Sequence, residues 1–238
     1  MKTMNNIFFL IVILSTNAIQ AITGFAGTLL AMPASMILIG VDEAKVVLNL
    51  ITLITCIVIA FNNRKNINFK VLKKIIVFMG IGMCCGIFIY KVVAVKFLLY
   101  VYGAMIIFLA IKNLFFKKEV KLSNSMIIIL LLVAGVIHGM FISGGALLVV
   151  YMAYELKNKD EFRATMASVW VLLNTFMAGM QVYSGIINKE LIILIAIALI
   201  PAIVGVFIGN KMHEKISKGS FMKLTYTLLL ISGMVIFI

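Results

Sequence analysis

The sequence contains few charged residues and almost no proline. Of its 238 residues, 12% are charged and two are proline, whereas 64% are hydrophobic. Soluble domains carry about a quarter charged residues, so this composition excludes a conventional water-soluble fold. Charged clusters separate apolar runs that approach the roughly 20 residues needed to cross a bilayer as a helix. We therefore expect an all-α polytopic membrane protein with a multi-pass location in the cell membrane.

Residue types that catalyse reactions or bind metal ions are also scarce. The chain has two histidines, eight carboxylates and three cysteines, and their spacing matches no metal-binding or catalytic motif. We therefore expect no enzyme activity, no metal site and no cofactor. Cys56, Cys84 and Cys85 all lie within apolar runs, where we expect them to be buried as small hydrophobic residues.

The net charge of +13 has an explanation in membrane topology. Bases with no aqueous domain to carry them are usually topology signals and contacts with lipid headgroups. We therefore expect membrane lipids, and no nucleic acid, among the partners. When the loop at 62–74 is placed in the cytoplasm, most of the 21 basic residues fall on that side, as the positive-inside rule requires. The loop at 185–190 then lies outside.

The clearest positive feature is an internal duplication at an offset of 118 positions. The matched pairs are Asp42 and Asp160, Glu43 and Glu161, Lys45 and Arg163, and Gly27 and Gly145. A repeat in an almost wholly apolar chain is typical of secondary transporters built from two related halves. We expect a single transporter domain, with repeat 1 at about 5–116 and repeat 2 at about 123–238.

Hydropathy divides the chain into apolar segments, five in each half. The segments are 5–22, 25–40, 44–61, 71–90, 92–111, 126–140, 141–154, 164–184, 190–210 and 220–238. The stretches 5–40 and 126–154 are awkward for two full spans, and small residues interrupt each one. We therefore expect about eight full spans and a broken, re-entrant helical hairpin at the start of each half.

Because five segments per half is an odd number, the second half enters from the opposite face, and the halves form inverted repeats. The first segment also resembles a cleavable signal peptide. We expect it to remain in the protein because repeat 1 begins inside it. Each half also carries a Gly-x-x-x-Gly step, Gly82 to Gly86 and Gly205 to Gly209, which favours close approach of helix backbones in lipid.

The helix breaks are the expected binding site. Backbone that leaves helical form at membrane depth is tolerated only where protein or a water-filled cavity satisfies it. A helix that starts there directs free N–H groups and the positive end of its dipole into the cavity. We expect no lysine or arginine at this depth, so the helix starts would supply the positive potential for a small anion. The alternative is that the glycines only allow tight helix crossing. The candidate substrate-binding residues are Gln20, Thr23, Gly24, Gly27, Thr28, His138, Ser143, Gly144 and Gly145.

The titratable residues near these elements leave two interpretations open. His138, which matches Gln20 in the other repeat, is either an anion donor and proton carrier or a packed neutral side chain. The Asp-Glu pairs are expected to cap the helices that follow them. Proton coupling through His138, Asp42 or Asp160 is the second interpretation. Buried amides such as Asn174 are expected to form hydrogen bonds between helices.

Several motifs resemble the sulfite exporter TauE/SafE family of membrane permeases, from about residue 6 to the end. They are Gln20 to Pro33, Gly40 to Lys45, Gly135 to Gly145, Gly205 to Gly209, Lys215-Ile-Ser, Phe221 and Gly233. The resemblance implies two homologous halves, about eight spans, and export or import of small anions, typically sulfite, sulfonates or related sulfur oxyanions.

The sequence therefore predicts a secondary transporter for a small anion, driven by protons. A passive anion channel of the same architecture and a membrane enzyme or assembly subunit without transport activity are the alternatives. The expected partners are a small anionic substrate and membrane lipids. The sequence leaves open whether copies associate as a homo-oligomer.

Overall fold

The computed structural model describes residues 2–115, 123–156 and 158–213, and individual residues between 223 and 237. Regular structure within the three continuous ranges is helical throughout, which confirms the expected all-α class. The tenth expected segment, 220–238, falls largely outside the described residues. The helices are α1 (Lys2–Thr23), α2 (Ala26–Ile39), α3 (Val41–Asn62), the 3-10 helix η1 (Arg64–Asn66), α4 (Phe69–Val92), α5 (Val95–Phe115), α6 (Asn124–Phe141), α7 (Gly145–Glu155), α8 (Lys159–Tyr183) and α9 (Lys189–His213).

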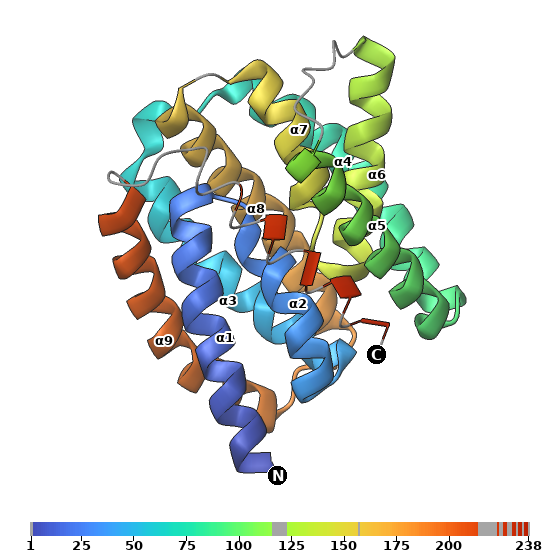
Figure 1. Cartoon of the computed structure of the whole chain (residues 1–238), viewed down its shortest axis with the longest axis vertical. Coiled ribbons are helices and arrows are strands. Elements are labelled where there is room, and N and C mark those ends of the chain that lie inside the picture. Colours follow the sequence, from blue (N-terminus) through green and yellow to red (C-terminus); the bar gives the residue numbers. More distant parts are fainter. Residues whose placement is uncertain are drawn as a thin grey trace.

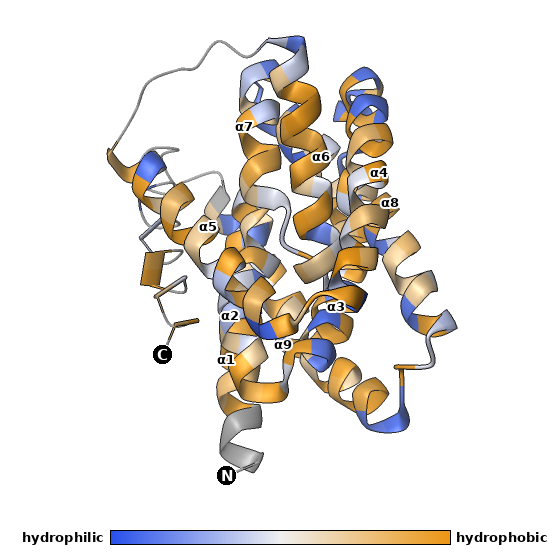
Figure 2. Cartoon of the chain, turned by 90° about the vertical axis from the view of Figure 1, so that its right-hand side faces the viewer, coloured by the Kyte–Doolittle hydropathy of each residue, from blue (hydrophilic) through white to orange (hydrophobic). Residues whose placement is uncertain are grey.

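Six of the described helices are long and apolar enough to cross a membrane, namely α3, α4, α5, α6, α8 and α9. Shorter apolar helices are found at Ile7–Thr23 within α1, at α2 and at α7. Figure 2 shows hydrophobic residues along the helices and hydrophilic residues gathered at helix ends and loops. This pattern is that of a multi-pass membrane protein.

Both expected helix breaks are present. α1 ends at Thr23 and α2 begins at Ala26, while α6 ends at Phe141 and α7 begins at Gly145. The chain turns at Gly24, with φ +84°, and at Ile142, with φ 56°. These two residues are 118 positions apart, so a residue with positive φ occupies the equivalent position in both breaks. In Figure 1 the blue hairpin of α1 and α2 enters from the end that carries the N-terminus, and the hairpin of α6 and α7 enters from the opposite end.

Two helix starts differ from the sequence expectation. α3 begins at Val41 and α8 at Lys159, so both Asp-Glu pairs lie inside the first helical turn. Their negative charges interact favourably there with the positive end of the helix dipole. The N-cap positions are instead Gly40 and Asn158. The Asn158 side-chain oxygen accepts hydrogen bonds from the backbone N–H groups of Asp160 and Glu161, at 2.8 and 3.2 Å. The acidic pairs are therefore not the caps themselves.

The main helix contacts join one half of the chain to the other. α1 packs against α9, α4 against α6 and α3 against α8. At the two Gly-x-x-x-Gly steps a Cβ atom would collide with a backbone carbonyl of the facing helix, which confirms their packing role. The collisions are Gly82 with Leu132 and Gly86 with Val136 between α4 and α6, and Gly205 with Leu14 and Gly209 with Ala18 between α9 and α1. The facing carbonyls of α6 lie 118 positions after those of α1, so the two helix pairs meet in equivalent registers.

The cysteines divide between the interior and the outer surface. Cys56 on α3 is buried, but Cys84 and Cys85 on α4 are exposed. The expectation of three buried cysteines was therefore wrong for this pair. An apolar run in a membrane protein has a face toward lipid as well as a face toward the core, and hydropathy alone does not distinguish them.

The glycine contacts predict a matched pair of stability effects in α4. Gly82→Ala places a methyl group against the Leu132 carbonyl and should destabilise the protein by about 1–3 kcal/mol, the usual cost of overpacking. Gly80→Ala is the control, because nothing lies within 4 Å of a Cβ there. Thermal unfolding of purified protein in detergent should show a lower melting temperature for Gly82→Ala only. Equal melting temperatures for the two variants would contradict the close approach of α4 and α6.

The topology is tested by labelling with a membrane-impermeant thiol reagent. In a background without Cys56, Cys84 and Cys85, Lys189→Cys should react in intact cells and Asn66→Cys should react only after the cells are opened. Both positions are exposed, so reactivity reports the side of the membrane. The opposite result would invert the topology that the positive-inside rule gives.

Candidate functional site

Trp170 on α8 joins the two helix breaks. Its indole Nε1 donates a hydrogen bond of 2.8 Å to the Gly24 carbonyl in the first break. A Cβ atom at Gly145, at the start of α7, would lie 3.4 Å from the Trp170 ring and 2.9 Å from the Phe25 carbonyl. The tips of the two hairpins therefore meet beside one tryptophan. The Trp170 side chain is only 4% exposed, which places the junction in the interior.

The Thr23 hydroxyl closes the first break. It donates to the Ile19 carbonyl at 2.7 Å and accepts from the backbone N–H groups of Phe25 and Ala26, at 3.4 and 3.3 Å. These bonds supply an acceptor to N–H groups that the start of α2 leaves without one in its own helix. Thr23 therefore stabilises the turn, and its hydroxyl proton is already in use.

Gln20 covers the backbone at Gly27. A Cβ atom at Gly27 would overlap the Gln20 carboxamide, so the glycine provides room for this side chain as it crosses the start of α2. Gln20 Nε2 donates to the Cys56 sulfur at 3.3 Å. Its Oε1 is buried and has no hydrogen-bond partner in the part of the chain that the structure describes. An anion that reached this backbone would have to displace the carboxamide.

His138 occupies the equivalent place in the second half. Its Nε2 shares a hydrogen bond of 2.9 Å with Asn174 Oδ1, and its ring stacks on Trp170 with centroids 5.1 Å apart. Because Asn174 lies 118 positions after Cys56, the Gln20–Cys56 and His138–Asn174 pairs are equivalent contacts. His138 Nδ1 and Asn174 Nδ2 are buried and have no hydrogen-bond partner among the described residues.

The remaining candidates fall into two groups. Ser143 donates its hydroxyl to the Phe141 carbonyl at 2.9 Å and stabilises the second turn, Gly144 packs against the His138 Cβ atom, and Thr28 is buried within α2. Asp42 and Asp160 are exposed in the first turns of α3 and α8, and neither lies at a hairpin tip. Asp42 accepts a hydrogen bond of 2.7 Å from the Tyr90 hydroxyl.

Arg163 is a buried cation that the sequence reasoning missed. It is 9% exposed, and its Cα lies 3.6 Å from where a Cβ would stand on Gly24. One guanidinium nitrogen donates to Asn210 Oδ1 on α9, and Nε has no hydrogen-bond partner within the described ranges. The expectation that no lysine or arginine lies near the breaks was therefore wrong. The earlier helix start at Lys159 explains the error, because it moves Arg163 from a loop into the packed part of α8.

These features place two helix starts and four buried polar atoms without partners among the described residues, one of them on the Arg163 cation, around a central junction. The four atoms are Gln20 Oε1, His138 Nδ1, Asn174 Nδ2 and Arg163 Nε. Asn174 Nδ2 and Arg163 Nε are hydrogen-bond donors, and His138 Nδ1 becomes a donor when the imidazole is protonated, which suits an anion. Among the described residues, no group of three or more His, Cys, Asp or Glu side chains is placed to hold a metal ion.

Comparison with known proteins gives one finding. The family model of the sulfite exporter TauE/SafE matches residues 8–236. No curated protein and no solved structure matches the chain.

The junction predicts a fluorescence effect, because Trp170 is the only tryptophan in the chain. Its emission in detergent should be shifted to the blue and should be quenched weakly by acrylamide. Gly145→Ala should increase the quenching, since the added methyl group would push against the Phe25 carbonyl and separate the tips. Gly179→Ala on α8 is the control, with nothing within 4 Å of its Cβ. Unchanged quenching in Gly145→Ala would show that the tips do not meet at Trp170.

Proposed function

Because the match covers nearly the whole chain, the protein belongs to the sulfite exporter TauE/SafE family, and we propose that it moves a sulfur oxyanion or an organosulfonate such as sulfite across the cell membrane by alternating access. The family supports a membrane permease of sulfur anions. The substrate and the mechanism rest on the arrangement of this chain's own residues. Residues 5–116 and 123–238 would act together as one transport domain.

The meeting of the two hairpin tips at Trp170 carries the proposal. In lipid, non-helical backbone persists only where protein or a water-filled cavity surrounds it. Here two such turns from different halves share one indole ring. Discontinuous helices that meet near the bilayer midplane form the substrate sites of many secondary transporters, where helix N-termini face anionic groups. Each N-terminus offers about half an elementary positive charge. Binding by such partial charges is weak enough for a small anion to be released after transport.

The equivalent contacts of the two halves support an inverted repeat. The turns at Gly24 and Ile142, the pairs Gln20–Cys56 and His138–Asn174, and the α1 and α6 carbonyls that face the glycine steps are all related by the offset of 118 positions. The hairpins also enter from opposite ends of the bundle (Figure 1). Two similar halves with opposite orientation can exchange their conformations, which is how such proteins alternate access.

The unequal ends of the bundle support alternating access as well. A cavity opens where α3 begins and where α4 and α8 end. At the other end of α8, Asn68 bridges the halves. Its backbone N–H donates a hydrogen bond to the Thr165 hydroxyl at 2.9 Å, and its side-chain Nδ2 donates to Glu161 Oε1 at 2.7 Å. The Arg163–Asn210 contact lies at this same end. The structure thus has a cavity at one end of the bundle, called the open end below, and the two hydrogen bonds of Asn68 across the halves at the other.

Proton coupling is the second part of the proposal, with His138 as the carrier. His138 Nε2 donates to Asn174, and Nδ1, which has no partner among the described residues at the second break, can accept a proton. Asp42 and Asp160 are the alternative carriers. Both are exposed at helix starts, where protonation would alter contacts at the two ends of the bundle.

The experiment is uptake of radiolabelled sulfite by proteoliposomes with an imposed pH gradient. We expect accumulation above the external concentration, and its loss when an uncoupler dissipates the gradient. His138→Gln should flatten the pH dependence of uptake and retain binding, which the change in Trp170 emission measures. Sulfate, thiosulfate, a short organosulfonate and a carboxylate, tested in the same binding assay, identify the preferred anion.

Three outcomes would count against parts of this proposal. Uptake that equilibrates and ignores the uncoupler would favour a passive channel. An unchanged pH profile in His138→Gln, Asp42→Asn and Asp160→Asn would remove the proton assignment. No response of Trp170 emission to any of the anions, together with no uptake, would refute an anion transporter.

A further inference from the structure

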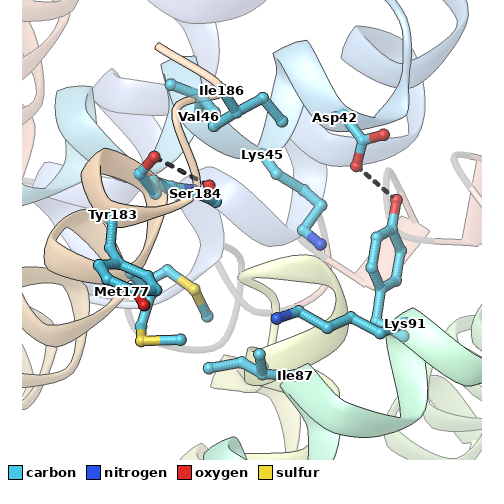
Figure 3. A pocket seen from close by; sticks show the side chains of 13 residues that line it. Asp42, Lys45, Val46, Ile87, Lys91, Met177, Tyr183, Ser184 and Ile186 are labelled. Atoms are coloured by element: carbon cyan, nitrogen blue, oxygen red, sulfur yellow. Dashed lines mark hydrogen bonds between the residues drawn. The ribbon is translucent and has the colours of Figure 1, made fainter.

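A cavity of about 240 Å³ lies at the open end of the bundle. It is bordered by the first turn of α3, the last turn of α4 and the end of α8 (Figure 3). Its polar lining residues are Asp42, Lys45, Tyr90, Lys91, Gln181, Tyr183 and Ser184. Since a water molecule takes about 30 Å³ in the liquid, the volume accommodates a small oxyanion with part of its hydration shell.

Two ammonium groups share this cavity. Lys45 and Lys91 extend their side chains from α3 and α4 into the same space (Figure 3). Lys45 Nζ stands 3.2 Å from the centroid of the Tyr90 ring. Neither lysine forms an ion pair with a carboxylate of the described residues. Two like charges that face one space attract an anion, and low-dielectric walls focus that field.

Asp42, the one acidic side chain that lines the cavity, is hydrogen-bonded to Tyr90 rather than to a lysine. Tyr90 donates its hydroxyl to Asp42 Oδ1 at 2.7 Å, and the same ring receives the Lys45 ammonium on its face. Asp42 and Tyr90 thereby fix the position of Lys45 without neutralising it in an ion pair. With one carboxylate against two ammonium groups, the lining keeps a net positive charge.

A line of buried amides leads from the cavity to the second helix break. Gln181 lines the cavity and accepts from Asn49 Nδ2 at 2.9 Å. The same Asn49 nitrogen donates to the Asn174 carbonyl at 3.2 Å, and Asn174 Oδ1 bonds to His138. Gly139, the neighbour of His138, also borders the cavity. The path therefore joins α3, α8 and α6 in the interior of the bundle.

We propose that the cavity is an entry site for the transported anion, in which Lys45 and Lys91 bind a small oxyanion before it passes along the amides to His138 and the second break. The inference rests on the proposed transport function and adds a site to it. In the equivalent place of the other half, Arg163 is bonded to Asn210 and buried. That cation would become the corresponding entry group when the other end opens.

The test compares lysine variants in sulfite uptake and in binding measured by Trp170 emission. Lys45→Gln with Lys91→Gln should raise the KM for sulfite about tenfold, near the lower limit of electrostatic focusing in a charged cleft, and leave the maximal rate within about twofold. The KM of the wild type should rise with ionic strength, and the double variant should lose most of that rise. Lys96→Gln, an exposed lysine on α5 at the same end, is the control and should behave as the wild type.

Single variants and the lipid composition sharpen the test. Lys91 is exposed, so Lys91→Gln alone tests the site even when the double variant is unstable. Lys45→Arg should retain the low KM of the wild type, unlike Lys45→Gln, because arginine keeps the positive charge. Vesicles of phosphatidylcholine, with and without phosphatidylglycerol, separate a free anion from a lipid headgroup. A lysine effect in both vesicle types supports the entry site, whereas an effect confined to phosphatidylglycerol vesicles would assign the cavity to lipid and overturn it.

The two proposals fail in different ways. Absence of sulfite, thiosulfate and sulfonate uptake by the wild type would refute the transport function itself. Wild-type uptake with an unchanged KM and an unchanged salt dependence in Lys91→Gln and in the double variant would leave the transport function intact and refute the entry site.

Discussion

The structure depends on giving partners to the backbone that leaves helical form at Gly24 and at Ile142. In a bilayer each unsatisfied N–H or C=O group costs several kcal/mol, so a turn at that depth has to be enclosed by protein. Thr23 and Ser143 form hydrogen bonds with backbone groups at the two turns, and the Trp170 indole donates a hydrogen bond to the Gly24 carbonyl. The position of α8 between the hairpins follows from this requirement, because it carries the tryptophan to both tips.

The halves are interleaved rather than placed side by side. α1 of the first half is backed by α9, and α6 of the second half by α4, so neither hairpin is supported by its own half alone. The glycine contacts bring these backbones close together, which strengthens van der Waals packing in a solvent that offers no hydrophobic effect between helices. Each hairpin is therefore packed directly against the opposite half.

The sequence was sufficient for the helical class, the two breaks and the glycine steps, because small residues and the repeat spacing mark them directly. Trp170 could not be found in this way, since its equivalent in the first half is Thr52 and the repeat gives no matching aromatic residue. Arg163 was hidden by a helix start placed five residues too late, although its pairing with Lys45 in the repeat marked the position. The chain Gln181–Asn49–Asn174 depends on side-chain contacts between distant helices, which hydropathy does not encode.

The two turns differ in one respect that their matched positions conceal. Glycine adopts a positive φ at no steric cost, but a β-branched residue such as Ile142 pays about 1–3 kcal/mol for it. Ile142 is 1% exposed, so the surrounding packing holds it in that conformation. The second hairpin therefore stores backbone strain that the first does not, and any motion that loosens the packing at Ile142 releases it. The two hairpins are consequently unequal in backbone energy, although their turns occupy matched positions.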